Sequence, residues 1–149
     1  RKGLLVSDSL NNTDAKSQAL TGLAGIYIGL ANYPEADKYL TEVGKLVPKM
    51  HGRQLFIYYN TLGNYYFYKG DYNRTLRIFK RMNAHLNAIT NTDFDRNLTW
   101  LNLADAYIRT GHIDSALAYP NKCKNFYETN QNKTAPYSLE TQQIPILLQ

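Results

Sequence analysis

Apolar residues recur along the chain in three stretches that share one spacing. In each stretch a large apolar residue is followed three positions later by a leucine, then by a small residue, and three positions further on by a tyrosine. The three sets are Leu20, Leu23, Ala24 and Tyr27; Tyr59, Leu62, Gly63 and Tyr66; and Trp100, Leu103, Ala104 and Tyr107. Apolar residues at this spacing lie on one face of an α-helix. The pattern therefore predicts three amphipathic helices.

Each of these helices is followed by a stop signal and a second helix. Four residues after each tyrosine stands Ala31, Gly70 or Gly111, and glycine ends a helix well because it takes the left-handed conformation without steric cost. A second apolar pattern then follows at once, with its own small residue at Ala36, Thr75 or Ala116. Each unit is thus predicted to be a helical hairpin with a tight turn. The expected helices are 14–30 and 34–47, 52–69 and 72–88, and 93–110 and 113–129.

The combined pattern of the three units resembles the tetratricopeptide repeat (TPR). The resemblance implies an all-α fold, a right-handed α-solenoid of stacked antiparallel helix hairpins. The units start near Ser17, Phe56 and Asn97, so their periods are 39 and 41 residues, against about 34 in the family. Longer helices or longer connections must take up the difference. Pro120 stands where the family has an aromatic residue, and we expect it to kink the helix or unravel a turn.

The sequence is interpreted as one TPR-like domain over residues 1–149. Residues 1–13 are expected to be the tail of a preceding unit, 17–50, 56–89 and 97–130 the three repeats, and 136–149 the start of a further helix. The chain begins with Arg1 and not with methionine, and we expect it to be part of a longer protein. Apolar residues make up 44% and charged residues 19%, which is typical of a globular domain and not of a disordered one.

The charge, the apolar runs and the cysteine content restrict the interpretation only slightly. The formal net charge of +5 is mildly basic and does not by itself indicate nucleic acid. The longest apolar run, Leu23 to Leu30, is too short to span a membrane, so no membrane contact is expected from this segment. Cys123 is the only cysteine, and the compartment, cytoplasmic or periplasmic, stays undetermined.

Many aromatic rings fall on the predicted core positions, and the others are candidates for a binding surface. The core set is Tyr59, Tyr66, Tyr72 and Phe79. Tyr58, Tyr65, Phe67 and Tyr68 do not all fit this stripe, and residues off it should face the concave groove or a neighbouring unit.

The resemblance to TPR proteins implies a concave groove lined by the first helices. The candidate groove residues are Asn60, Asn64, Phe67, Tyr68, Asn102, Asp105 and Arg109. Asparagine side chains both donate and accept hydrogen bonds, so Asn60, Asn64 and Asn102 would suit a peptide backbone. The glycines of the first unit would make its end of the groove shallow and allow close approach. The alternative is an exposed polar surface without a ligand.

Several other kinds of site are not supported. A carboxylate clamp of the kind known in TPR proteins is incomplete, because Asn60 stands where the clamp needs a lysine. His51, His85 and His112 lie in different units without metal-ligand spacing, and Cys123 falls on a core stripe. No nucleophile motif or phosphate-binding loop is present. We therefore expect no catalysis, no cofactor and no metal.

A basic stripe, Arg74, Arg77 and Arg81, falls on the outer face of a second helix. It is interpreted as a solvated convex face, which makes nucleic-acid binding the weakest of the functional hypotheses.

The sequence thus predicts a non-enzymatic module that holds a protein or peptide partner in its groove. Its long period resembles the TPR region of bacterial signalling or transcriptional regulators, which favours a sensory or regulatory segment of a larger bacterial protein. The alternative is a scaffold or accessory domain of an enzyme, such as a sensor kinase or peptidase, whose catalytic part lies outside these residues. The end units lack capping faces, so self-association through them also stays open.

Overall fold

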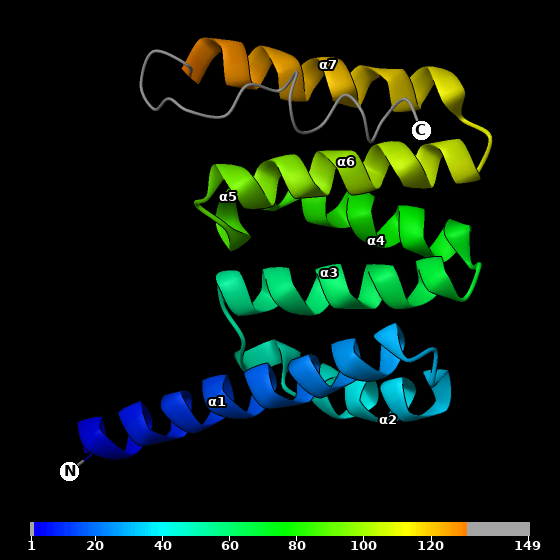
Figure 1. Ribbon diagram of the computed structural model, residues 1–149. Coiled ribbons are helices and arrows are strands. Elements are labelled where there is room, and N and C mark those ends of the chain that lie inside the picture. The colour runs from blue at the N-terminus through cyan, green and yellow to red at the C-terminus, as the bar shows by residue number, and fades with distance from the viewer. Residues whose placement is uncertain (1, 131–149) are drawn as a thin grey trace.

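The computed structural model describes the backbone of residues 2–130 and the side chains of residues 12–125, 128 and 129. This part of the chain consists of helices joined by short connections and contains no strand (Figure 1). Its elements are α1 (Lys2–Gly29), α2 (Tyr33–Gly44), the short 3-10 helix η1 (Val47–Lys49), α3 (Arg53–Tyr68), α4 (Tyr72–Ala84), α5 (Leu86–Ile89), α6 (Asp93–Arg109) and α7 (Ile113–Asn130). The helix expected over 136–149 lies outside the described residues.

Three antiparallel hairpins, α1/α2, α3/α4 and α6/α7, stack one after another along the molecule (Figure 1). Adjacent hairpins contact each other mainly through α1 with α3 and through α4 with α6. The predicted all-α, TPR-like solenoid is therefore confirmed.

The three hairpin turns share one hydrogen-bond pattern. Each stop residue has a positive φ: 54° at Ala31, 82° at Gly70 and 81° at Gly111. The next backbone N–H then reaches back to the carbonyl of the repeat tyrosine, a bond that closes the helix end. These bonds are Asn32 to Tyr27 (2.9 Å), Asp71 to Tyr66 (2.9 Å) and His112 to Tyr107 (2.8 Å). The shared pattern shows that the three turns are structurally equivalent.

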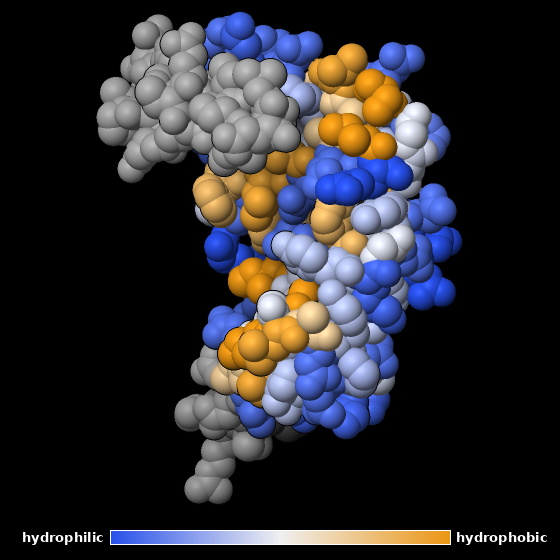
Figure 2. Space-filling view, turned by 45° about the vertical axis from the view of Figure 1, so that its right-hand side comes forward, coloured by the Kyte–Doolittle hydropathy of each residue, from blue (hydrophilic) through white to orange (hydrophobic). Residues whose placement is uncertain are grey.

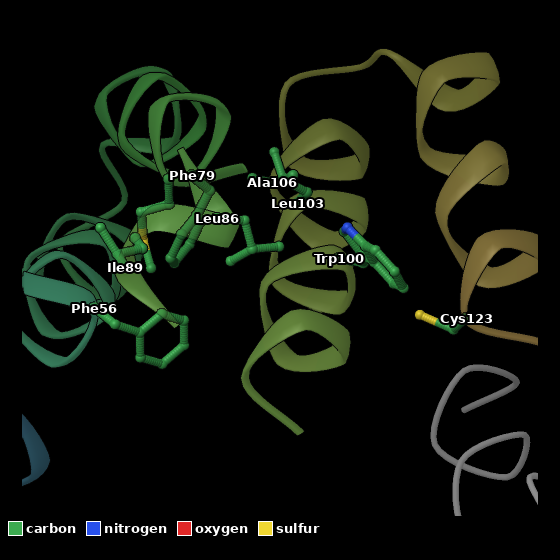
Figure 3. Packing of buried hydrophobic residues seen from close by; sticks show 9 residues of the cluster. Phe56, Phe79, Leu86, Ile89, Trp100, Leu103, Ala106 and Cys123 are labelled. Carbon is green, nitrogen blue, oxygen red and sulfur yellow. The ribbon is translucent and has the colours of Figure 1, made fainter. Parts of the chain in front are cut away.

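Small residues allow the two helices of a hairpin to approach closely. In the second unit, the ring of Phe79 lies directly over Gly63, where an added Cβ would stand 2.6 Å from two ring carbons. The Thr75 hydroxyl also donates a hydrogen bond to the Gly63 carbonyl at 3.2 Å. Side chains from the second and third units then form one buried cluster (Figure 3). Its labelled members are Phe56, Phe79, Leu86, Ile89, Trp100, Leu103, Ala106 and Cys123.

The aromatic rings are distributed differently from the expectation. Phe79 is buried as predicted, but three of the expected core rings are only half-buried: Tyr59, Tyr66 and Tyr72. Tyr58 and Tyr65 are buried instead. The Tyr65 hydroxyl donates a hydrogen bond to Asp37 Oδ1 on α2 at 3.3 Å, and burial raises the pKa of the Tyr58 hydroxyl. These two rings therefore pack between the first and second units.

Two helix boundaries also differ from the expectation. Residues 2–10, expected to end a separate helix, continue into the first hairpin as the single helix α1. Residues 11–14 contain no proline or glycine, so the modest helix propensities of asparagine and threonine do not break it. Helix α7 continues through Pro120 without an unravelled turn. Ala116 and Cys123, one turn away on either side, are buried, and this packing holds the helix together.

Candidate interaction groove

The second and third units are joined by a pair of asparagine side chains on their first helices. Asn102 Nδ2 on α6 donates to Asn60 Oδ1 on α3 at 3.0 Å. Both side chains are half-buried. The pair leaves the Asn60 amide nitrogen and the Asn102 carbonyl oxygen without a described protein partner, and such groups can bind a ligand.

Asn64 and Tyr68 lie toward the first unit and line a pocket of about 490 Å³ between α1 and α3. The pocket is lined by Gly25, Ile28, Gly29, Ala31, Tyr33, Thr61, Asn64 and Tyr68. The Tyr68 side chain is 63% exposed. Within the described part of the chain, the half-buried Asn64 amide has no hydrogen-bond partner. An unpaired amide beside an exposed ring is a common arrangement for ligand contact.

The glycines of α1 leave the floor of this pocket bare. A Cβ added at Gly25 or Gly29 would meet no atom within 4 Å. The pocket is therefore bounded on this side by helix backbone, and an extended ligand could approach it closely. The shallow first-unit end of the groove was expected from these glycines.

Arg109, Asp105 and Phe67 form a second cluster toward the third unit. The Arg109 guanidinium lies over the rings of Phe67 (5.5 Å) and Tyr72 (5.7 Å), and its Nε is 3.5 Å from Asp105 Oδ1. Such cation–π contacts orient a guanidinium, whereas this half-exposed ion pair contributes little stability. Phe67, expected as an open wall of the groove, is thus partly covered by Arg109.

The seven candidate residues therefore form two clusters and one linking pair. Asn64 and Tyr68 lie beside the first unit. Phe67 lies beside the third unit, which itself carries Asp105 and Arg109. Adjacent rings of Phe67 and Tyr68 connect the clusters at 5.7 Å between centroids, and Asn60 with Asn102 lies between the two helices.

Two pocket residues were not predicted: Ala31 and Tyr33. The groove prediction used only first-helix positions carried over from the TPR pattern, whereas Ala31 lies in the turn and Tyr33 begins α2. The Tyr33 hydroxyl donates to the Tyr68 carbonyl at 3.2 Å. No sequence signal could have identified this contact, because it depends on how two hairpins pack.

The remaining chemistry-bearing residues have structural surroundings. Burial raises the pKa of the Cys123 thiol to about 11, so the thiol stays protonated and unreactive at neutral pH. Among the described residues no three His, Cys, Asp or Glu side chains come together as a metal site would require. None of the described helices combines the length and apolar character needed to cross a membrane.

The basic stripe lies on the outer face of α4, with Arg74, Arg77 and Arg81 exposed. Arg74 pairs with Asp71 at 3.3 Å and lies over the Tyr66 ring at 5.2 Å. The other two arginines have no described ion pair, as expected for a solvated convex face.

Comparisons with known proteins agree with the helical-repeat fold. The sequence model of the family described as "SusR N-terminal TPR domain" matches residues 1–145. Among curated proteins, no sequence matches the chain. The crystal structure of BtubC (BKLC) from P. vanneervenii is similar with a TM-score of 0.70 and 22% identity, which shows the fold alone. The match covers 82% of this chain and 50% of that one, so the present chain spans half the length of this neighbour.

Proposed function

This chain belongs to the SusR N-terminal TPR domain family, and we propose that it is the sensory or regulatory segment of a larger bacterial signalling protein. As a TPR domain it is a protein-interaction module. In this proposal the groove on α1, α3 and α6 holds an extended peptide or a segment of a partner protein, and its occupancy sets the state of the parent protein.

The observation that carries the proposal is the pocket between α1 and α3. It combines the unpaired Asn64 amide, the exposed Tyr68 ring and the bare backbone at Gly25 and Gly29. An amide can bond the backbone of a peptide irrespective of its sequence, and an exposed tyrosine contributes contact area at low entropic cost. The glycines leave room for the main chain of the ligand.

The Arg109 end adds a preference for ligand charge. Its guanidinium is held by two rings and by Asp105, so it is positioned before a ligand arrives. An acidic or carbonyl-rich stretch of the partner would gain a charge-assisted hydrogen bond there. We therefore expect the ligand to contact the first unit through its main chain and the third unit through an acidic or carbonyl group.

Affinity capture with the purified chain, followed by binding measurements with synthetic peptides from the captured partner, tests the proposal. We expect Asn64→Ala and Tyr68→Ala to weaken peptide binding at least tenfold. Asn121→Ala, an exposed asparagine on α7, is the matched control and should bind as the wild type does. Asn64→Ala is a cleaner probe than a change at Asn60 or Asn102, because those two side chains bond each other across the units.

Salt dependence separates the groove from the basic outer face. Groove binding should weaken only moderately between 50 and 300 mM NaCl, since Arg109 is its one cationic contact, whereas binding through the three α4 arginines should weaken steeply. Equal affinity of the Asn64→Ala variant and the wild type would refute the groove proposal. The competing role, an accessory domain of an enzyme, uses the same groove, and a catalytic domain in the parent sequence would favour it.

A further inference from the structure

The C-terminal half of α1 presents an apolar surface to solvent. Between residues 19 and 31 every exposed residue is glycine, alanine, leucine or isoleucine. Leu23, Ile26 and Leu30 are 38%, 60% and 69% exposed. Figure 2 shows one of several apolar patches in the lower half of the molecule, where α1 and α2 lie in Figure 1. A helix that is apolar on all sides is normally covered.

The same helix face is buried in the two later units. In the repeat alignment, Leu23 and Ile26 of α1 correspond to Leu62 and Tyr65 of α3, and to Leu103 and Ala106 of α6. Tyr65, Leu103 and Ala106 are buried and Leu62 is half-buried. In α3 and α6 these residues belong to the buried clusters that each helix shares with the preceding hairpin. The exposed face of α1 therefore continues the series of inter-unit contacts and has the shape of a surface that packs against a helix.

Two parallel rows on this face make it complementary to itself. Leu23, Ile26 and Leu30 form a ridge, and Gly22, Gly25 and Gly29 form a groove beside it with the same spacing. A Cβ added at any of these glycines would meet no atom within 4 Å, so the groove is empty. Helices pack by placing the ridge of one into the groove of the other. A twofold axis would place each ridge in the groove of an identical helix.

The charge distribution makes this face the one at which an identical partner meets the least repulsion. The chain carries a formal charge of +5, and two copies would repel each other through most orientations. No charged residue lies between residues 17 and 34. Contact through this face keeps like charges away from the centre of the interface.

We propose that this face of α1 is the contact surface of a symmetric dimer, in which α1 of one copy packs against α1 of a second copy. The proposal does not depend on what the groove between α1 and α3 binds. Gly25 and Gly29 line both this surface and the groove pocket, so the second copy would add a wall to the open side of that pocket. A single helix face is smaller than the roughly 800 Å² per partner of a standard interface. We therefore expect a dissociation constant of about 1–100 µM.

Sedimentation velocity between about 1 and 500 µM protein tests the dimer. The wild type should pass from its monomer mass of 17.1 kDa to a plateau at twice that mass. Ile26→Glu and Gly25→Leu should each weaken dimerisation at least tenfold. The leucine at position 25 points into open space, so circular dichroism should show unchanged helicity. Phe94→Glu, at another exposed apolar side chain on α6, is the matched control and should dimerise as the wild type does.

A cysteine placed at the centre of the ridge tests the symmetry. The native Cys123 is buried, so the background of disulfide formation is low. Ile26→Cys should yield a disulfide-linked dimer under mild oxidation, whereas Leu117→Cys, exposed on α7, should not. A wild type that stays monomeric at 500 µM, a mass that rises without a plateau, or full dimerisation of Ile26→Glu would each overturn the proposal.

Discussion

Gly63 and Gly25 are both helix-interior glycines, yet the structure predicts opposite effects of replacing them with alanine. Gly63 lies under the Phe79 ring, and an added Cβ would stand 2.6 Å from two of its carbons. Gly25 lies on the exposed face of α1, where a Cβ would meet nothing within 4 Å. Gly63→Ala should destabilise the protein, and Gly25→Ala should stabilise it.

The magnitudes follow from two competing effects. Alanine in a helix interior is more favourable than glycine by about 0.5–1 kcal/mol, which is the whole expected gain for Gly25→Ala. At Gly63, carbon atoms that prefer about 3.5–4.0 Å would be forced together against a ring that is 1% exposed. Overpacking of this kind costs about 1–3 kcal/mol. Contacts of 2.6 Å place this cost in the upper part of the range, so the net effect of Gly63→Ala should be a loss of about 1–2.5 kcal/mol.

Urea and thermal denaturation of the two variants at low micromolar concentration provide the assay. At about 2–4 °C per kcal/mol for a chain of this size, Gly63→Ala should melt several degrees below the wild type and Gly25→Ala slightly above it. Phe79→Ala is a useful companion, because it should lose about 3–5 kcal/mol as a large-to-small core change. If Gly63→Ala were as stable as Gly25→Ala, Phe79 would not lie over Gly63, and the close packing of α3 on α4 would be refuted.

Three further predictions concern the unit boundary, the buried thiol and the groove. Arg53→Met should lower the free energy of unfolding by about 3 kcal/mol, because the buried Asp95 carboxylate would lose its ion pair and keep the hydrogen bond from the Thr90 hydroxyl. In urea titrations, the Arg53→Met/Asp95→Asn double variant should recover part of that loss. The pKa of Cys123 is raised from 9.0 to about 11. The stability that the protonated thiol contributes is therefore complete below pH 9 and is lost as the pH rises toward 11. The wild type should lose more stability between pH 8 and 10.5 than the Cys123→Ala variant does. Asn64→Ala should change the free energy of unfolding by less than about 1 kcal/mol, and a larger loss would place Asn64 in the core.

The hairpins were predictable because their signals are local. The stop residues Ala31, Gly70 and Gly111 lie where the three turns form, and each turn closes with the same hydrogen bond. The burial of individual rings was less predictable. Tyr58 and Tyr65 contact α2, which belongs to the preceding hairpin. The angle between hairpins decides whether such a ring faces its own unit or the neighbouring one.

The proximity of Asn60 and Asn102 was predictable, whereas their hydrogen bond and the surroundings of Phe67 were not. Asn60 and Asn102 lie 42 residues apart, and their shared position in the repeat suggested that they are neighbours. Their hydrogen bond to each other was not predictable, because an asparagine facing solvent gives the same sequence signal. Phe67 was expected in the open wall of the groove, but the cation–π contact with Arg109 depends on the rotamer of a long side chain.

The long repeat period has a structural explanation in the connections between hairpins. The residues beyond the usual TPR length lie in η1 and its flanks, and in α5 and its flanks. These connections are not loose loops, because Met50 is buried in the cluster of the first two units, and Leu86 and Ile89 are buried in the cluster of the next two.

Each added segment therefore contributes buried apolar side chains where one hairpin joins the next, at the opposite end of the helices from the hairpin turns. The pocket lined by Ala31 and Tyr33 lies at the turn end, which receives no such filling. The longer period thus adds buried apolar side chains where consecutive hairpins join, while the candidate groove pocket lies beside a hairpin turn, which has no inserted segment.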